Sequence, residues 1–189
     1  VTVFDGSLVV TGSVFQEISC NMLNNRQDLS LLSNLTSGST LWITGGFQFV
    51  FLHDNTFSKL EAMVAPVLVA QYDTMDQDGV NNPPIILDSL TVVDSHGLHS
   101  SAIYITSLTQ LSVLIQNCTF ERNTLSLNYD LASGLLEGDS LSGNIVISAE
   151  PSGGPSFANL ELPSDLSQYE DVLSCLNCVS VRNSRWEDV

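Results

Sequence analysis

Hydrophobic and polar residues alternate in several short segments of this 189-residue chain. In the segment 101–123, Ile103 and Ile105 form one alternating run, residues 111–116 form a second, and Phe120 lies in a third. A two-residue period is typical of strands with one buried face, whereas a helix repeats its apolar residues every three to four positions. The pattern therefore predicts three short strands separated by tight corners.

Parts of this segment recur elsewhere in the chain. Copies of the first strand lie at 40–44, 66–70 and 144–148, with the end of a further copy at 1–4. Copies of the second and third strands share a corner, which the alignment places at Gly12, Asp54, Ser89, Asn117 and Cys178. Gly, Asn and Asp tolerate the left-handed backbone that a one-residue corner requires, whereas Ser89 and Cys178 fit it less well.

Equivalent positions stack on one another if the chain winds into a solenoid of strands. The aligned copies then contribute one interior column, made of Phe15, Phe57, Val92, Phe120 and Val181. Unequal spacing between the copies predicts insertions at 19–39, 71–83, 122–143 and 149–172. A solenoid tolerates insertions because each leaves at a corner without disturbing the stack. We therefore expect an all-β fold, a single right-handed parallel β-helix segment of about five coils spaced about 4.8 Å apart.

Two short motifs resemble a known repeat. Ser100-Ser101-Ala102-Ile103 and Phe120-Glu121-Arg122-Asn123 resemble the Gly-Gly-Ala-Ile and Phe-x-x-Asn motifs of the polymorphic outer membrane protein type of β-helix repeat. This resemblance implies a parallel β-helix of the pectate-lyase-like kind. Proteins of this kind are commonly surface-exposed adhesins, sheath components or carbohydrate-active enzymes, and the fold does not decide among these functions.

The charge balance argues against two classes of partner. The chain has 21 acidic and 5 basic residues, for a formal net charge of −16. Nucleic-acid binding requires a basic surface, and anionic membranes attract basic segments, so we expect neither partner. No apolar run approaches the roughly 20 residues that span a bilayer. Because Val1 begins no signal-peptide pattern, we expect any targeting segment to have been removed or to lie outside this sequence.

Enzymatic chemistry has little support in the sequence. Glycoside hydrolysis needs two neighbouring carboxylates, and Asp54, Asp88 and Asp94 are predicted to lie on different coils. A lyase needs a base, and Arg122 and Arg182 are predicted on matching faces of successive coils. We assign no catalytic residue, but a polysaccharide lyase or hydrolase stays an alternative.

One segment is a candidate calcium loop. Asp76 and Asp78, followed by Gly79, resemble the middle of a calcium-binding loop, although Thr74 occupies the first ligand position and no glutamate completes the set. A solvated turn is the favoured interpretation. We expect no other cofactor, and we expect the histidines to occupy corners rather than to bind zinc.

The four cysteines are Cys20, Cys118, Cys175 and Cys178. The last two form a single C-x-x-C, which lacks the second pair that a zinc site needs. The alignment places Cys118 and Cys178 one position apart on successive coils, within reach of a disulfide. Disulfides would indicate a secreted protein, and four buried free thiols are the alternative.

Two N-glycosylation sequons begin at Asn34 and Asn117. Asn34 lies in a polar segment that is predicted to be a loop, whereas Asn117 lies at a corner where its side chain is expected to turn inward. Trp42 and Tyr104 align on outward positions, where they could stack on a sugar or be ordinary surface aromatics.

We expect an extracellular or cell-surface glycoprotein with a structural role. The sequence has no convincing amphipathic helix to cap either end of the solenoid, and open ends expose strand edges that pair with other strands. Stacking on further coils or on copies of itself would build a surface coat, a sheath or a filament. The alternatives are a carbohydrate-active enzyme and an adhesin or glycan-binding module.

Overall fold

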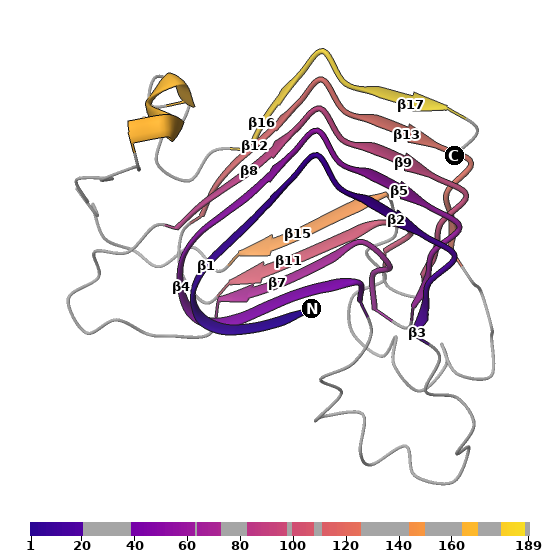
Figure 1. The fold of residues 1–189 in the computed structure, drawn as a ribbon, viewed down its shortest axis with the longest axis horizontal. Coiled ribbons are helices and arrows are strands. Elements are labelled where there is room, and N and C mark those ends of the chain that lie inside the picture. The colour runs from indigo at the N-terminus through magenta and orange to yellow at the C-terminus, as the bar shows by residue number, and fades with distance from the viewer. Residues whose placement is uncertain are drawn as a thin grey trace, which may run out of the picture.

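A computed structural model describes the chain at residues 1–20, 39–62, 64–72, 83–97, 100–107, 111–125, 144–149, 164–169 and 179–187. The described part is all-β apart from one short 3-10 helix, and its strands wind into a parallel β-helix (Figure 1). Every paired strand is parallel to its neighbour. The predicted fold class is confirmed.

The strands form five coils in chain order. Coil 1 holds β1 (Thr2–Thr11), β2 (Val14–Gln16) and β3 (Ser19–Cys20), and coil 2 holds β4 (Leu41–His53), β5 (Thr56–Ser58) and β6 (Glu61–Ala62). Coil 3 holds β7 (Leu68–Tyr72), β8 (Pro84–Asp88), β9 (Thr91–Val93) and β10 (His96–Gly97). Coil 4 holds β11 (Ile103–Ser107), β12 (Ser112–Gln116), β13 (Thr119–Glu121) and β14 (Thr124–Leu125), and coil 5 holds β15 (Ile145–Ala149), β16 (Val179–Arg182) and β17 (Arg185–Glu187).

Stacked strands form three sheets. The largest has the order β15-β11-β7-β4-β8-β12-β16, with β1 also paired to β4, and the others have the orders β17-β13-β9-β5-β2 and β14-β10-β6-β3. The first sheet is folded, because β4 pairs with β7 through its first half and with β8 through its second. At the fold Gly45 has a φ of 90°, and a Cβ there would lie 2.4 Å from Asp5 Oδ1. Only glycine fits this bend.

A complete coil therefore has four strands rather than the predicted three. The additional strands, β3, β6, β10 and β14, are two residues long each. A two-residue strand is too short to show an alternating pattern, so it could not be predicted from the period of the hydrophobic residues.

The predicted interior column is correct at four of its five positions. Phe57 pairs with Phe15 on one side and with Val92 on the other, and Val92 pairs with Phe120. The prediction for Val181 is wrong, because Val181 pairs with Ile115 and Trp186 takes the place next to Phe120. The alignment had set the last coil too early in the chain.

The predicted registers of the first-strand copies also have clear outcomes. The copies at 1–4, 40–44 and 144–148 stack as expected. The copy at 66–70 is shifted by one position, since Leu68 rather than Val67 pairs with Ile103.

Left-handed residues make two corners in each complete coil. The first corner lies at Gly12, Asp54, Ser89 and Asn117, as predicted, and at Asn183 instead of Cys178. The second corner was not predicted, and its residues are Glu17, Lys59, Asp94 and Arg122, with φ between 50° and 56°. A left-handed non-glycine residue costs about 1–2 kcal/mol, so the stacked neighbours must hold this conformation.

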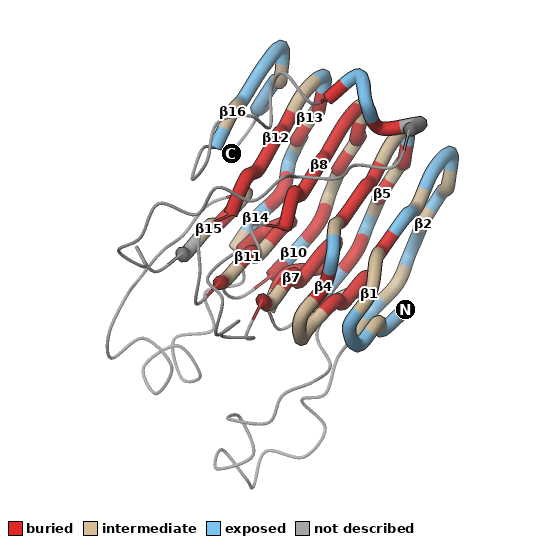
Figure 2. Tube along the Cα trace, turned by 90° about the vertical axis from the view of Figure 1, so that its left-hand side faces the viewer, coloured by how far each residue is buried: buried red, intermediate tan, exposed pale blue. Residues whose placement is uncertain are grey.

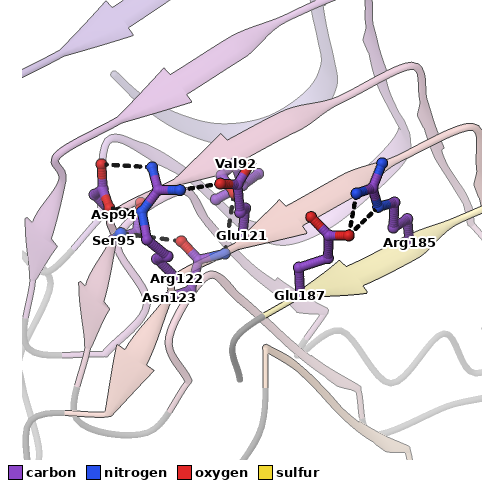
Figure 3. Close-up of polar contacts among 8 residues, drawn as sticks. All are labelled: Val92, Asp94, Ser95, Glu121, Arg122, Asn123, Arg185 and Glu187. Carbon is purple, nitrogen blue, oxygen red and sulfur yellow. Dashed lines mark hydrogen bonds and ion pairs between the residues drawn. The ribbon is translucent and has the colours of Figure 1, made fainter.

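Two buried asparagines join neighbouring coils at the corners. Asn123 accepts a hydrogen bond from Ser95 N at 3.0 Å and donates one to Val92 O at 3.0 Å (Figure 3). Asn55 makes the same pair of bonds to the backbone of coil 1, with Ser13 N at 2.9 Å and Val10 O at 2.8 Å. Such bonds satisfy corner backbone groups that have no strand partner.

The core fills the centre of the solenoid. Buried residues are concentrated in coils 2 to 4, whereas exposed residues dominate the first and last coils (Figure 2). Most residues of the four predicted insertions lie outside the described residues. At their margins, β3, the end of β7, the residues 122–125 and the end of β15 belong to the coils, so all four insertions begin later than predicted.

Candidate functional site

The last coil leaves its inward side chains open to solvent. Its strands pair with coil 4 on one edge, and the described residues place no strand on the other edge. The inward residues are strongly exposed, at 52% for Val179, 50% for Val181 and 41% for Trp186. Their partners in coil 4 are at most 2% exposed, namely Val113, Ile115 and Phe120. The core is therefore continued into coil 5 but not covered there.

An apolar hollow of about 390 Å³ opens at this end. Its lining comes from β12 in coil 4, from the three described strands of coil 5 and from the residue before β15, and comprises Ile115, Asn144, Ile145, Ile147, Val179, Val181 and Trp186. The Trp186 ring stacks on Phe120 with centroids 5.7 Å apart and planes 11° apart. We call this hollow and the open edges of β15, β16 and β17 the C-terminal end surface.

The first coil presents a second open end. Val3, Val10, Phe15 and Ile18 are partly buried against the core, and Phe15 stacks on Phe57 with centroids 5.0 Å apart. The described residues place nothing on the free edges of β1, β2 and β3. We call these side chains and edges the N-terminal end surface.

Exposed apolar side chains gather at these two ends. Within the described ranges, all the large hydrophobic residues that are exposed belong to coil 1 or coil 5: Val1, Phe4, Val9, Val14, Val179, Val181 and Trp186. A monomeric protein normally scatters such residues, so the first and last coils are the candidate regions for contact with a partner.

The two ends differ in charge. The described residues of coil 5 carry two arginines, Arg182 and Arg185, and one acid, Glu187, which forms an ion pair with Arg185 (Figure 3). The described residues of coil 1 carry only acids, Asp5 and Glu17. In a chain with a net charge of −16, a basic excess at one end is a local exception.

Asp88, at the end of β8, is a buried carboxylate and therefore a catalytic candidate. Asp88 is 5% exposed; Tyr169 OH donates to its Oδ2 at 2.7 Å, and Asn117 and Ser89 donate to its Oδ1. Burial raises the pKa of Asp88, but the hydrogen bonds together lower this pKa below its usual value. His53 Nδ1 lies 3.4 Å from Oδ2 without the geometry of a hydrogen bond.

This carboxylate serves to hold a segment in place. Leu166 and Tyr169 belong to the 3-10 helix η2 (Ser164–Tyr169), which covers the outward residues Phe51, Ile86 and Leu114. Burial and the negative charge of Asp88 raise the pKa of Tyr169, so its hydroxyl stays a donor. The hydrogen bond from Tyr169 and the apolar contacts of Leu166 therefore fasten η2 to the sheet.

The other candidates for catalysis are dispersed. Asp94 lies in coil 3 together with Asp88, contrary to the prediction of different coils, but it lies at the second corner. Arg122 lies at the second corner and pairs with Asp94 at 2.7 Å, whereas Arg182 pairs with Gln116 in another sheet. The two arginines therefore do not share a face, contrary to the prediction. Asp54 is exposed at the first corner.

The outward aromatic residues do not form a sugar platform. Trp42 is 6% exposed and packs with Ala65 and Val69, and Tyr104 packs against the same cluster. A side chain this buried cannot stack on a ligand, so the structure favours ordinary packing for Trp42.

The described cysteines are free. Cys20 lies in coil 1 and Cys118 in coil 4, three strand spacings or about 14 Å apart along the solenoid, so they cannot pair. The residue beside Cys118 in coil 5 is Ser184, whose Oγ accepts a hydrogen bond from Cys118 N. The reason for pairing Cys118 with Cys178 is therefore removed, and both Cys175 and Cys178 lie outside the described residues.

The remaining sequence candidates have mixed outcomes. Asn117 is exposed at its corner and donates a hydrogen bond to Asp88, so its side chain does not turn inward. Asn34, Asp76 and Asp78 lie outside the described residues. In the part that is described, no group of three or more metal-type side chains forms.

Trp186, which lines the hollow, and Asn183, at the corner before it, are the residues of the candidate site that sequence reasoning missed. A closer comparison of 181–186 with 115–120 would have found them, because both segments have an asparagine corner and an aromatic residue at the end.

The described residues contain no helix of the length and apolarity that a membrane crossing needs. A scan of protein-family models, a search of curated proteins and a search of solved structures each find no match.

Proposed function

We propose that this chain is a structural β-helix unit that is joined to further β-helix coils through its two end surfaces. The observation that carries the proposal is the exposure of the inward column in coil 5, where Val179, Val181 and Trp186 are 41–52% exposed. In a finished solenoid these positions are buried by the next coil, as they are in coil 4.

Strand addition supplies the physical reason. The free edges offer rows of unpaired N–H and C=O groups, which bind another edge through main-chain hydrogen bonds while pockets select the side chains. Covering the hollow would also remove apolar surface from water, which stabilises by about 25 cal/mol per Å². The edge and the hollow are therefore covered by the same partner.

A structural unit of this kind suits a surface coat, a sheath or a filament outside the cell. The resemblance to the polymorphic outer membrane protein repeat supports that setting, and so do the sequons at Asn34 and Asn117. Glycans at these sequons, together with an acidic surface, would keep the outer faces of the solenoid soluble and direct contact to its ends.

Trp186 provides a direct readout of end contact. In a Trp42→Phe background, Trp186 is the one remaining tryptophan, and its emission should shift to shorter wavelength as concentration rises and its ring becomes buried. Sedimentation velocity on the same samples should show assemblies larger than the monomer.

Val181→Arg tests the surface itself. A charge in the hollow should keep the protein monomeric and the Trp186 emission at long wavelength, because an unpaired buried charge is strongly unfavourable. Gln48→Arg is the matched control, since Gln48 is exposed on β4 away from the hollow, and it should assemble like the parent. The proposal is refuted if the parent protein stays monomeric, with unchanged emission, up to about 100 μM. At that concentration only contacts with a binding free energy weaker than about 5 kcal/mol escape detection.

A further inference from the structure

We infer that the partner of the C-terminal end surface is a second copy of this chain, bound head to tail through its N-terminal end surface. In this arrangement coil 5 of one copy lies on coil 1 of the next with the register of the solenoid continued. The inference rests on the proposed function and adds the identity, polarity and register of the partner.

The inward columns of the two end surfaces match in chemistry. Strand pairing through the coils puts Val179 and Leu8 in one column, and Val181 and Val10 in another. A copy placed in register would therefore set aliphatic side chains against aliphatic side chains at both positions. The aliphatic side chains of the next copy would fill the hollow at these positions without burying a polar group.

The aromatic column continues in the same way. Phe15 begins this column and Trp186 ends it. At both ends the rings already stack nearly flat, with 5° between Phe15 and Phe57 and 11° between Trp186 and Phe120. Trp186 has its other face on the hollow, where the Phe15 ring of the next copy would continue the stack.

The column that contains Ile147 of β15 also matches between the two end surfaces. Ile147 shares its column with Ile105, Ala70, Ile43 and Val3, so the next copy would place Val3 on Ile147. In this arrangement, apolar residues of the two copies are therefore in contact along β15, β16 and β17, the three described strands that border the hollow.

The backbone at the junction is compatible. The first corner is left-handed at Asn183 in coil 5 and at Gly12 in coil 1, with φ of 48° and 58°. Parallel pairing with the next copy therefore requires no change of corner geometry. Two C-terminal ends facing each other would instead have to pair antiparallel, and the irregular outline of the coil would meet its reverse (Figure 1).

Charge favours unlike ends. The described part of coil 5 has Arg182 and Arg185 against one acid, whereas the described part of coil 1 has Asp5 and Glu17 and no basic side chain. Head-to-tail contact brings an end with a basic excess against an acidic end, whereas pairing of like ends would bring arginine to arginine or acid to acid. In the continued register Arg182 shares its column with Thr11 and Arg185 shares its column with Val14, so this preference belongs to the ends as a whole and not to new ion pairs. Because such a contact is heterologous and does not close, repeated contacts would produce a filament.

Two blocked variants test the polarity. Val181→Arg removes the C-terminal end surface, and Val10→Arg removes the N-terminal end surface. Each variant alone should sediment as a monomer, because it has only one functional end. An equimolar mixture should give a complex of twice the monomer mass and nothing larger, because one intact end of each kind is available. Trp186→Arg with Val3→Arg repeats the test at other columns, and circular dichroism of each variant checks that the coils fold.

The outcomes separate this inference from the proposed function. Dimers of Val10→Arg alone would show that C-terminal ends pair with each other, which overturns the head-to-tail arrangement but keeps assembly through the ends. A mixture that stays monomeric while the parent assembles also overturns the inference. A parent that does not assemble overturns both, and assembly of all four variants would place the contact away from the ends and overturn both as well.

Discussion

Asn123 offers a strong test of how the coils are held together. Its side chain is 2% exposed and bridges two backbone groups of the preceding coil, Ser95 N and Val92 O. Replacing it with alanine removes both hydrogen bonds and leaves the Ser95 amide buried without this acceptor. A hydrogen bond contributes about 0.5–1.5 kcal/mol and an unsatisfied buried group costs about 1–3 kcal/mol, so we expect a loss of about 2–4 kcal/mol.

The free energy of unfolding in urea, followed by circular dichroism, measures this loss. The midpoint should fall while the slope with urea stays constant, because the surface exposed on unfolding hardly changes. Asn123→Leu separates hydrogen bonding from volume, since Leu60 occupies the equivalent position in coil 2 and is fully buried. We expect Asn123→Leu to lose less than Asn123→Ala but not to match the parent.

Gln16→Ala is the control for deletion of a polar side chain, because Gln16 is exposed and bonds only to a neighbouring exposed residue. Its effect should stay within about 0.5 kcal/mol. If Asn123→Ala also falls within that range, or if Asn123→Leu is as stable as the parent, the reasoning that these amides secure the corners is wrong.

Three further substitutions have defined outcomes. A Cβ at Gly97 would lie 1.9 Å from the Ser100 carbonyl oxygen, so Gly97→Ala should lose about 1–3 kcal/mol in urea unfolding, and an unchanged midpoint would contradict this. Burial raises the pKa of Cys118 to about 11, so a thiol reagent near pH 8 should modify Cys118 only after unfolding. The unfolded thiol ionises at a lower pH than the folded one. Relative to Cys118→Ala, the parent should therefore lose stability between about pH 9 and pH 11. Tyr169→Phe removes a donor to ionised Asp88 and should cost about 1–3 kcal/mol of unfolding free energy near pH 7. This difference should shrink below about pH 4, because Asp88, whose pKa is lowered in the fold, then takes up a proton. A difference that is independent of pH would count against the bond.

The sequence predicted the features that come from alternation. Inward residues such as Ile103, Ile115 and Phe120 recur with a period of two, and burial on one face of a strand is the cause of that period. The fold class and four positions of the aromatic column followed from them. The last coil was misplaced because 176–181 and 181–186 both resemble 115–120, and only three-dimensional stacking shows that Trp186 lies on Phe120.

Other features depend on tertiary structure. Charged residues such as Lys59 and Arg122 rarely adopt a left-handed backbone, so their corner has no local signal, and hydrogen bonds across coils hold it. The bond between Asp88 and Tyr169 joins residues 81 positions apart, which no periodicity can reveal. Of the candidate site, the sequence predicted open ends, but which side chains are exposed there depended on the register.

The second corner also controls the order in which coils can be stacked. Its residues alternate in sign from one coil to the next, and Lys59 pairs with Glu17 at 3.1 Å as Arg122 pairs with Asp94 at 2.7 Å. If a misfolded or domain-swapped chain omitted a single coil, two residues of the same sign would become neighbours at the strand spacing of about 4.8 Å. Omission of two adjacent coils would restore opposite neighbours. The alternating charges at this corner therefore disfavour any stack from which a single coil is missing.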